Sequence, residues 1–319
     1  MNKTLYELGA EIDLSYNKLT DLPTAKIKSP ALRRLDVSHN QIAVIPDNID
    51  KVYTLVYLNL SYNELEVIPR ELGFLKYLHE LDISHNRLTA LPEEMCTQAY
   101  SLVILNASDN ALTVLPVDIG KMKVMEDLNV GNNQIEMLPE EITDLKYLKK
   151  FDISGNKLTT VDVLSSLKAI EELRVAKNSI TALPEDLHRL KQLITFDFSD
   201  NYIKAIPSTL NRIISLKDIV AANNKIDAIQ DSLGKHQLLR TLDLTGNRTV
   251  SPTEQNWTPD NLDLNPLGFH HWGCLKYKIR GENLGKNPRL ERNHHGEHKK
   301  REFSRAVANE AGVCSEQLR

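Results

Sequence analysis

Short segments in which apolar and polar residues alternate recur along most of the chain. Residues 78–88 show the pattern most clearly: they read LHELDISHNRL, with two alternating apolar positions at 81 and 83 and an asparagine at 86. Alternation with a period of two predicts a short strand with one buried face. One such strand cannot bury its apolar face alone, so copies must stack side by side and share a continuous core.

The asparagine that follows each predicted strand sets the period of the pattern. It returns at a nearly constant spacing, with one interval a single residue longer and one a single residue shorter than the rest. The eleven positions are Asn17, Asn40, Asn63, Asn86, Asn110, Asn133, Asn156, Asn178, Asn201, Asn224 and Asn247. Each asparagine stands where the chain must turn, and its side chain is suited to bond backbone groups that would otherwise be unpaired in the turn. We therefore interpret these asparagines as structural.

The pattern LxxLxLxxNxL at a period of about 20–29 residues is the sequence signature of a leucine-rich repeat solenoid, and residues 5–250 resemble that family. The resemblance implies an α/β solenoid, a horseshoe with a parallel β-sheet on its concave face and short helical or 3-10 segments on its convex face. We expect eleven repeats over residues 1–250, a C-terminal cap over 251–275, and a basic, flexible tail over 276–319.

The segments that return from one strand to the next share a second motif. Residues 91–95, 138–142 and 183–187 read LPEEM, LPEEI and LPEDL. Proline suits the first turn of a helix because its missing N–H would be unpaired there, and carboxylates suit the positive end of the helix dipole. The motif predicts short helices. The fifth copy is one residue longer near residues 95–100, and the seventh has Asp162 in place of proline, which predicts a different connector.

Charge and cysteine content favour a cytoplasmic protein without a membrane span. The formal net charge is −4, from 39 basic and 43 acidic residues, which predicts neither general nucleic-acid binding nor a membrane-surface role. Cys96, Cys274 and Cys314 are odd in number and widely spaced, so no disulfide-bonded caps are expected. The start of the chain runs directly into a repeat without a secretory signal, and no apolar run approaches the length of a membrane-spanning helix.

Motifs of common enzymes are missing from the sequence. It contains no GxxxxGK[ST], GxSxG, HExxH or GxGxxG pattern, and its serines and aspartates recur too evenly to mark one active site. We therefore expect no catalytic activity, no cofactor and no metal site. The histidines of the tail lack paired-ligand spacing, and the cluster at residues 299–301 is a weak basic signal.

The outward residue four positions before each asparagine forms a nearly uniform polar column. Nine of its eleven members are Asp or Asn, which reflects either the family consensus or an acidic stripe that attracts a basic partner. Arg174 is the only cation in the column. We predict a contact patch there, with a solvated charged face as the alternative. The candidate residues are Lys149, Lys150, Glu172, Arg174 and Lys177, together with the outward carboxylates Glu80, Asp82 and Asp127.

A second candidate surface is aromatic. Tyr16, His39, Tyr62 and His85 stand directly before the first four asparagines, and Tyr57 lies nearby in the sequence. Tyrosine is a common interface anchor, although the row could equally serve packing. The two histidines are two repeats apart, roughly 10 Å at the usual strand spacing. Ligands of one zinc ion lie about 2 Å from it, so a shared metal is not expected.

The style of the repeats, LPxxI followed by LxxLxxLDLSxN, is similar to that of the cytosolic Ras–Raf scaffold family, the plant Ras-group-related repeat proteins, and the Scribble and Erbin polarity proteins. That resemblance implies a non-catalytic adaptor or scaffold in intracellular signalling, whose protein partner could be a small GTPase, a kinase or a phosphatase subunit. No nucleic-acid partner is expected. The alternative is the regulatory repeat region of a truncated or larger signalling enzyme, such as a leucine-rich-repeat protein phosphatase.

Overall fold

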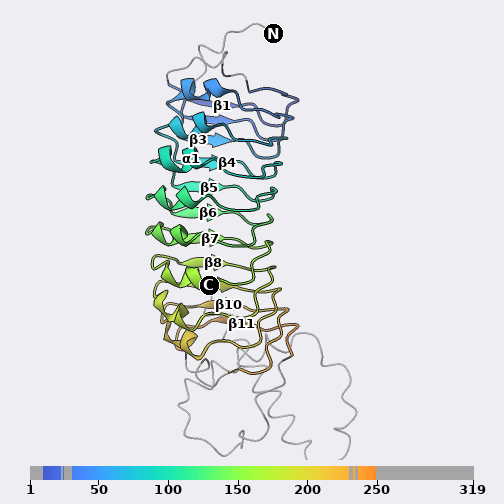
Figure 1. Ribbon diagram of the computed structural model, residues 1–319, viewed down its shortest axis with the longest axis vertical. Helices are drawn as coiled ribbons and strands as arrows, with labels where there is room; N and C mark the ends of the chain where they lie inside the picture. The colour runs from blue at the N-terminus through green and yellow to red at the C-terminus, as the bar shows by residue number, and fades with distance from the viewer. Residues whose placement is uncertain (1–9, 23, 25–30, 230–232, 234–235, 249–319) are drawn as a thin grey trace, which may run out of the picture. The chain divides into compact units, whose positions relative to one another are not determined.

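Eleven short strands form one parallel sheet in the computed structural model, which describes residues 10–22, 24, 31–229, 233 and 236–248 (Figure 1). Each strand has three residues, and the middle one is buried. The strands are β1 (Glu11–Asp13), β2 (Arg34–Asp36), β3 (Tyr57–Asn59), β4 (Glu80–Asp82), β5 (Ile104–Asn106), β6 (Asp127–Asn129), β7 (Lys150–Asp152), β8 (Glu172–Arg174), β9 (Thr195–Asp197), β10 (Asp218–Val220) and β11 (Thr241–Asp243).

Neighbouring strands pair in register, so equivalent residues of successive repeats lie beside one another. Leu58 of β3 pairs with Leu81 of β4, and Leu81 pairs with Leu105 of β5. The sheet follows the chain order from β1 to β11 without a crossover. The predicted leucine-rich repeat solenoid, with one strand per repeat, is confirmed.

Short helices return the chain behind the sheet. They are η2 (Asp47–Val52), η3 (Arg70–Phe74), α1 (Glu93–Gln98), η4 (Val117–Lys121), η5 (Glu140–Asp144), η6 (Asp162–Ser166), η7 (Glu185–Arg189) and η8 (Ser208–Arg212). All but α1 are 3-10 helices, and most follow a proline in extended conformation, such as Pro139 (φ −67°, ψ 147°). The proline motif therefore predicts both the presence and the start of these helices.

The two irregular repeats behave as their sequences suggest. In the longer fifth copy, the N–H of Ala99 donates to the carbonyl of Met95, four residues back, whereas the equivalent N–H of Leu75 reaches only three residues back to Leu72. The extra residue is thus accommodated as an α-helical turn. In the seventh copy, Val161 precedes η6 with φ −135° and ψ 24°, a different entry from the proline-led one.

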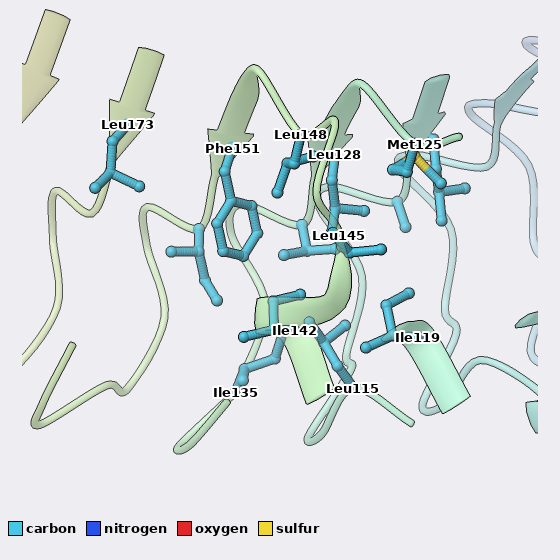
Figure 2. Close-up of a cluster of buried hydrophobic side chains, with 14 of the residues drawn as sticks. Leu115, Ile119, Met125, Leu128, Ile135, Ile142, Leu145, Leu148, Phe151 and Leu173 are labelled. Carbon is cyan, nitrogen blue, oxygen red and sulfur yellow. The ribbon is translucent and has the colours of Figure 1, made fainter. Parts of the chain in front are cut away.

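The core is a continuous layer between the sheet and the short helices (Figure 2). Leu128 and Phe151 point inward from β6 and β7, and Ile119 and Ile142 meet them from η4 and η5. All four side chains are at most 1% exposed. Burial of apolar area is the main favourable contribution to folding, and here each repeat buries its area only against its neighbours.

The asparagine row joins each coil to the one before it. The side-chain nitrogen of Asn133 donates to the carbonyl oxygens of Ala107 (3.1 Å), Val130 (3.0 Å) and Gly131 (3.1 Å). Its side-chain oxygen accepts the N–H of Leu112 at 2.9 Å. One buried side chain therefore satisfies backbone groups of two successive repeats, and the structural interpretation of the row is confirmed.

Cys96 is part of the core of the fifth repeat. It is 1% exposed, and burial raises the pKa of its thiol to about 12. At neutral pH it is a small apolar side chain rather than a nucleophile. Cys274 and Cys314, the expected cap over 251–275 and the expected tail over 276–319 lie outside the described residues.

Candidate protein-binding site

The outward side chains of the sheet form a strongly acidic surface, which we call the sheet face. It consists of the first and third residues of the eleven strands. Eleven of these 22 residues are Asp or Glu and three are Lys or Arg, which gives a formal charge of −8. The whole chain carries only −4. The sheet face therefore concentrates negative charge that is balanced elsewhere on the molecule.

A pocket of about 250 Å³ opens on the sheet face over β6, β7 and β8. Parallel pairing creates it by placing Asp127 beside Lys150 and Lys150 beside Glu172. The same pairing aligns the third residues of these strands. The lining residues are Asp127, Asn129, Lys150, Phe151, Asp152, Glu172 and Arg174. Two cations and three carboxylates thus gather in one place.

The charged side chains of the pocket pair loosely with one another. The Glu172 carboxylate lies 3.8 Å from Nζ of Lys150 and 3.6 Å from Nη2 of Arg174. Arg174 Nη1 lies 3.8 Å from the Asp152 carboxylate. Partly exposed ion pairs of this length contribute little to stability. A charged partner could therefore exchange these contacts for its own at low cost.

Asp127 is a partly buried carboxylate of this group. Burial raises the pKa of Asp127, Lys150 opposes that shift, and Glu172 adds to it. A half-buried carboxylate at the edge of a pocket is a strong hydrogen-bond acceptor for a basic or N–H group of a partner. The pocket thus offers both acceptors and cationic donors, which suits a protein surface with mixed charges.

Lys149 and Lys177 lie apart from the pocket lining, although the sequence places them close to it. Lys149 precedes β7, and its Nζ lies 2.7 Å from the Glu126 carboxylate. Lys177 lies in the turn after β8 with φ 53°. Of the five residues predicted around the seventh and eighth repeats, the structure therefore gathers Lys150, Glu172 and Arg174 in the pocket.

The four aromatic residues before the first asparagines stack ring on ring. Tyr16 and His39 lie 4.1 Å apart between ring centroids, His39 and Tyr62 4.1 Å, and Tyr62 and His85 4.0 Å, with interplanar angles of 10°, 12° and 16°. His85 Nε2 then lies 3.5 Å from the Asp109 carboxylate. The ring faces between these side chains are covered by neighbours, so a partner would meet ring edges and the outer face of Tyr16.

The backbone of this row is left-handed in every described repeat. Its members have φ between 51° and 74°, a region that is costly for most residues but tolerated by Gly, Asn and Asp. Six of the seven later members follow that preference: Asp109, Asn132, Gly155, Asp200, Asn223 and Gly246. Lys177 and the tyrosines and histidines of the first four repeats are the exceptions, and the stacked rings of those four residues offset part of their backbone cost.

Tyr57, Glu80 and Asp82 belong to the sheet face rather than to the aromatic stack. The Arg34 guanidinium lies 3.9 Å from the centre of the Tyr57 ring, and burial together with Asp36 raises the pKa of Tyr57. Asp82 accepts the N–H of Ser84 at 2.9 Å, which makes the turn after β4.

The carboxylates of the polar column have this turn role in several repeats. Hydrogen bonds from Ser15 hold the pKa of Asp13 below its usual value, and Asp197 and Asp243 likewise accept the N–H two residues on. One oxygen of each of these carboxylates therefore serves the fold. The second carboxylate oxygen is free to face outward or to bond the neighbouring strand. In Asp82, this second oxygen accepts a hydrogen bond from the side-chain nitrogen of Asn106 at 3.1 Å.

Four residues of these surfaces were not among the candidate residues predicted from the sequence: Asn129, Phe151 and Asp152 in the pocket and Arg34 beside Tyr57. The available signal was the register: residues one repeat apart along the chain lie side by side on the sheet, so Asp127, Lys150 and Glu172 form one row. Among the described residues, no group of three His, Cys, Asp or Glu side chains is arranged to hold a metal ion.

Comparisons with known proteins show what the chain is similar to. Residues 14–132 match the family model of a leucine-rich repeat region. No curated protein sequence matches the chain. Over the described part of the chain, no helix is long and apolar enough to cross a membrane.

Solved structures share the fold. A leucine-rich repeat protein of Leptospira interrogans is 28% identical over 77% of this chain and 68% of its own, with a TM-score of 0.65. An internalin of Listeria monocytogenes is 18% identical over 76% and 69%, with a TM-score of 0.68, a likeness of fold alone.

A third solved structure of similar fold is a complex. It is the leucine-rich repeat ectodomain of the Arabidopsis thaliana receptor kinase GASSHO1/SCHENGEN3, in complex with CASPARIAN STRIP INTEGRITY FACTOR 2. It is 26% identical over 71% of this chain and 28% of its own, with a TM-score of 0.64.

Proposed function

We propose that this chain, whose fold is a leucine-rich repeat solenoid, is a non-catalytic adaptor or scaffold that binds a protein partner on its sheet face. Solenoids of this kind present extended surfaces for binding, and a receptor of similar fold is solved in complex with CASPARIAN STRIP INTEGRITY FACTOR 2. By analogy with the cytosolic repeat families that the sequence resembles, the partner is a component of intracellular signalling: a small GTPase, a kinase or a phosphatase subunit.

The pocket over β6 to β8 is the observation that carries this proposal. Elsewhere on the sheet face, the column of third residues is Asp, Asn or Val, and Arg174 interrupts it. Arg174 and Lys150 both pair with Glu172, so two cations lie side by side on a surface that is acidic as a whole. Two neighbouring cations among carboxylates favour one orientation of a charged partner, because like charges placed opposite one another are strongly unfavourable.

Affinity capture from cell extract, followed by mass spectrometry, tests the proposal with a charge-matched pair of variants. Lys150→Ala/Arg174→Ala removes the two cations of the pocket. Lys157→Ala/Arg189→Ala removes the same charge from a turn and from η7, and Arg189 is paired with Asp186 at 3.3 Å much as Arg174 is paired in the pocket. Circular dichroism and thermal melting establish that both variants are folded.

The proposal predicts that a captured protein is lost or at least tenfold depleted with the pocket variant and retained with the control. Such a loss corresponds to at least about 1.4 kcal/mol of binding free energy. Retention of every captured protein by the folded pocket variant would contradict the proposed site, and equal depletion by both variants would show that only overall charge matters.

A further inference from the structure

A second charged surface runs along the edge where each short helix leads into the next strand. In nine of the repeats, two residues lie at this edge. They follow the end of the helical segment and precede the buried apolar residue that leads into the strand. We call these positions the helix–strand edge. Its nine pairs are Tyr53–Thr54, Lys76–Tyr77, Tyr100–Ser101, Lys123–Val124, Lys146–Tyr147, Lys168–Ala169, Lys191–Gln192, Ile214–Ser215 and Gln237–Leu238.

The first residue of these pairs has the same backbone geometry in consecutive repeats. In six of them its N–H donates to the carbonyl oxygen two residues earlier, as Lys123 does to Lys121 and Lys146 to Asp144, both at 2.9 Å. All nine first residues are exposed. Neighbouring coils stack roughly 5 Å apart, so the side chains at this position form a row along the edge.

Charge on the helix–strand edge is of one sign only. Its eighteen residues include five lysines and no Asp or Glu. Lys123 Nζ lies 3.3 Å from the Asp144 carboxylate. In the described part of the chain, the remaining four lysines of the row have no ion pair: Lys76, Lys146, Lys168 and Lys191. Three of these four stand in successive repeats, where like charges repel unless an anion lies against them.

Large apolar side chains stand exposed between these lysines. Tyr147 is 62% exposed beside Lys146, and Tyr77 is 59% exposed beside Lys76. Further along the edge, Ile214 is 74% exposed. The other members of this exposed set are Tyr53, Tyr100, Val124 and Leu238. The edge thus combines unpaired cations with tyrosine and aliphatic side chains that no packing within the solenoid accounts for.

We propose that the helix–strand edge binds the surface of a membrane that contains anionic lipids. Basic residues near such a surface are attracted by its negative potential. Tyrosine is enriched at the level of the lipid headgroups, and the aliphatic stem of lysine lies along apolar surface while its charge stays in water. Because the edge residues occupy one position in each coil, a single continuous surface laid along the edge touches all of them.

Nucleic acid fits the same edge less well than lipid does. A nucleic-acid strand would use lysine for its phosphates and tyrosine for stacking on bases, but exposed Ile214, Val124 and Leu238 offer neither contact. The sheet face adds a reason for a defined orientation on the membrane. Its formal charge of −8 is repelled by anionic lipid, whereas the edge is attracted.

The proposal revises the expectation from net charge. A formal charge of −4 predicts no membrane-surface role only if the charge is spread evenly. The fold instead separates it into an acidic face and a basic edge. The membrane contact is independent of the proposed protein partner, so either can fail without the other.

Vesicle flotation with the full chain tests the contact. The probes are vesicles of phosphatidylcholine alone and vesicles of phosphatidylcholine and phosphatidylserine mixed two to one, at low and at physiological salt. The edge variant carries Lys76→Gln, Lys146→Gln, Lys168→Gln and Lys191→Gln. The control variant carries Lys18→Gln, Lys157→Gln, Lys204→Gln and Lys225→Gln, an equal charge change on the turns that follow the strands. A third variant, Tyr77→Ser/Tyr147→Ser, leaves the charge unchanged.

We expect the wild-type chain to float with the anionic vesicles and not with the neutral ones. Each basic residue at an anionic surface is worth a factor of about five in binding, so the edge variant, which lacks four lysines, should bind several hundred-fold more weakly. The tyrosine variant should bind the anionic vesicles several-fold more weakly than wild type. The control variant should lose no more than about twofold to fivefold in binding.

Three results would overturn the proposal. The first is a wild-type chain that floats no better with anionic than with neutral vesicles. The second is equal loss of binding by the edge and control variants, which would mean attraction by net charge alone. The third is wild-type binding that survives in the edge variant. Circular dichroism of each variant shows whether a loss of binding comes from unfolding. The tyrosine variant tests the apolar contribution to binding without a change of charge.

Discussion

The asparagine row and the sheet face are neighbours in every repeat, yet they differ in how much the residue type varies from repeat to repeat. The asparagine is the same residue in all eleven copies, whereas the strand residues four and six positions before it range from Asp and Glu to Tyr, Ile, Lys and Arg. Asn133 bonds backbone groups of two coils at once. The side chain of Lys150 instead pairs with another exposed side chain, the Glu172 carboxylate.

Stability and binding can therefore be altered separately in this protein. A residue that satisfies buried backbone groups is fixed by the geometry of the coil, and its loss leaves those groups unpaired. A residue on the sheet face is held by exposed ion pairs that are weak individually. Substitutions in the asparagine row should therefore change unfolding, whereas substitutions of sheet-face residues held only by exposed ion pairs, such as Lys150, should change binding with little effect on unfolding.

The largest effect is expected for Asn133→Ala. The substitution leaves the N–H of Leu112 and the carbonyl oxygens of Ala107 and Val130 without their partner, so the free energy of unfolding should fall by about 3 kcal/mol. Urea unfolding measures it. Asn17→Ala is the matched control, because Asn17 is exposed and, among the described residues, bonds only within its own turn, so its loss should cost about 1 kcal/mol or less.

A second, smaller effect is expected where two neighbouring helices approach each other. A Cβ added to Gly120 in η4 would overlap the carbonyl oxygen of Glu141 in η5, so Gly120→Ala should destabilise the chain by about 2 kcal/mol. Gly131→Ala is the control, since its added Cβ would lie no closer than 3.3 Å to any neighbour. Equal unfolding midpoints for the two variants would refute the close approach of the helices.

The aromatic stack is partly exposed, like the sheet face, but its rings contact one another, so we expect it to contribute to stability. Tyr62→Asn keeps a residue that tolerates φ near 53° but removes the ring between His39 and His85. We expect a loss of about 1 kcal/mol in the free energy of unfolding. Lys177→Asn, at the same backbone position but outside the stack, should change it by less than about 0.5 kcal/mol. A larger effect at Lys177 than at Tyr62 would argue against stabilisation by stacking.

The smallest effect is expected at Asp127, and it depends on pH. Because burial raises the folded-state pKa of Asp127 above its usual 3.8, its stabilising contribution is complete below about pH 4 and is lost as the pH rises through the folded-state value. Asp127→Asn should therefore gain a few tenths of a kcal/mol at pH 7 and nothing at pH 3. A variant that is less stable than wild type at pH 7 would show that Lys150 outweighs the cost of burial.

Periodicity alone predicts most of the fold. The LxL segments mark the strands, the Leu-Pro motif marks the start of the short helices, and the longer fifth repeat marks the one described α-helix, Glu93–Gln98. These features depend on contacts within a repeat or between equivalent positions of adjacent repeats. Aligning the repeats on their asparagines is therefore enough to locate the strands and the short helices.

The candidate site is predicted only in part, for a reason that lies in geometry. The sequence marks Arg174 as an exception in its column, but it does not show that Lys150 and Arg174 share Glu172. It also places Lys149 and Lys177 with them, whereas the pairing of Lys149 with Glu126 and the left-handed turn at Lys177 place these side chains elsewhere.

The helix–strand edge was not predicted from the sequence, for a different reason. Its lysines belong to the return segments, which we interpreted only for their helix starts, and not to the strands used for alignment. Their common position becomes visible from a shared backbone hydrogen bond, such as that from Lys168 to Ser166 at 3.0 Å.

Photo-crosslinking in cells tests the central claim, that the sheet face is the partner-binding surface, most directly. Ile104 stands 37% exposed on the sheet face beside β6, and Val117 stands 55% exposed at the start of η4 on the helix side of the same repeat. Benzoylphenylalanine is placed at one position or the other. Binding on the sheet face should give a discrete protein adduct from position 104 and none from position 117. An adduct from position 117 with none from position 104 would contradict it.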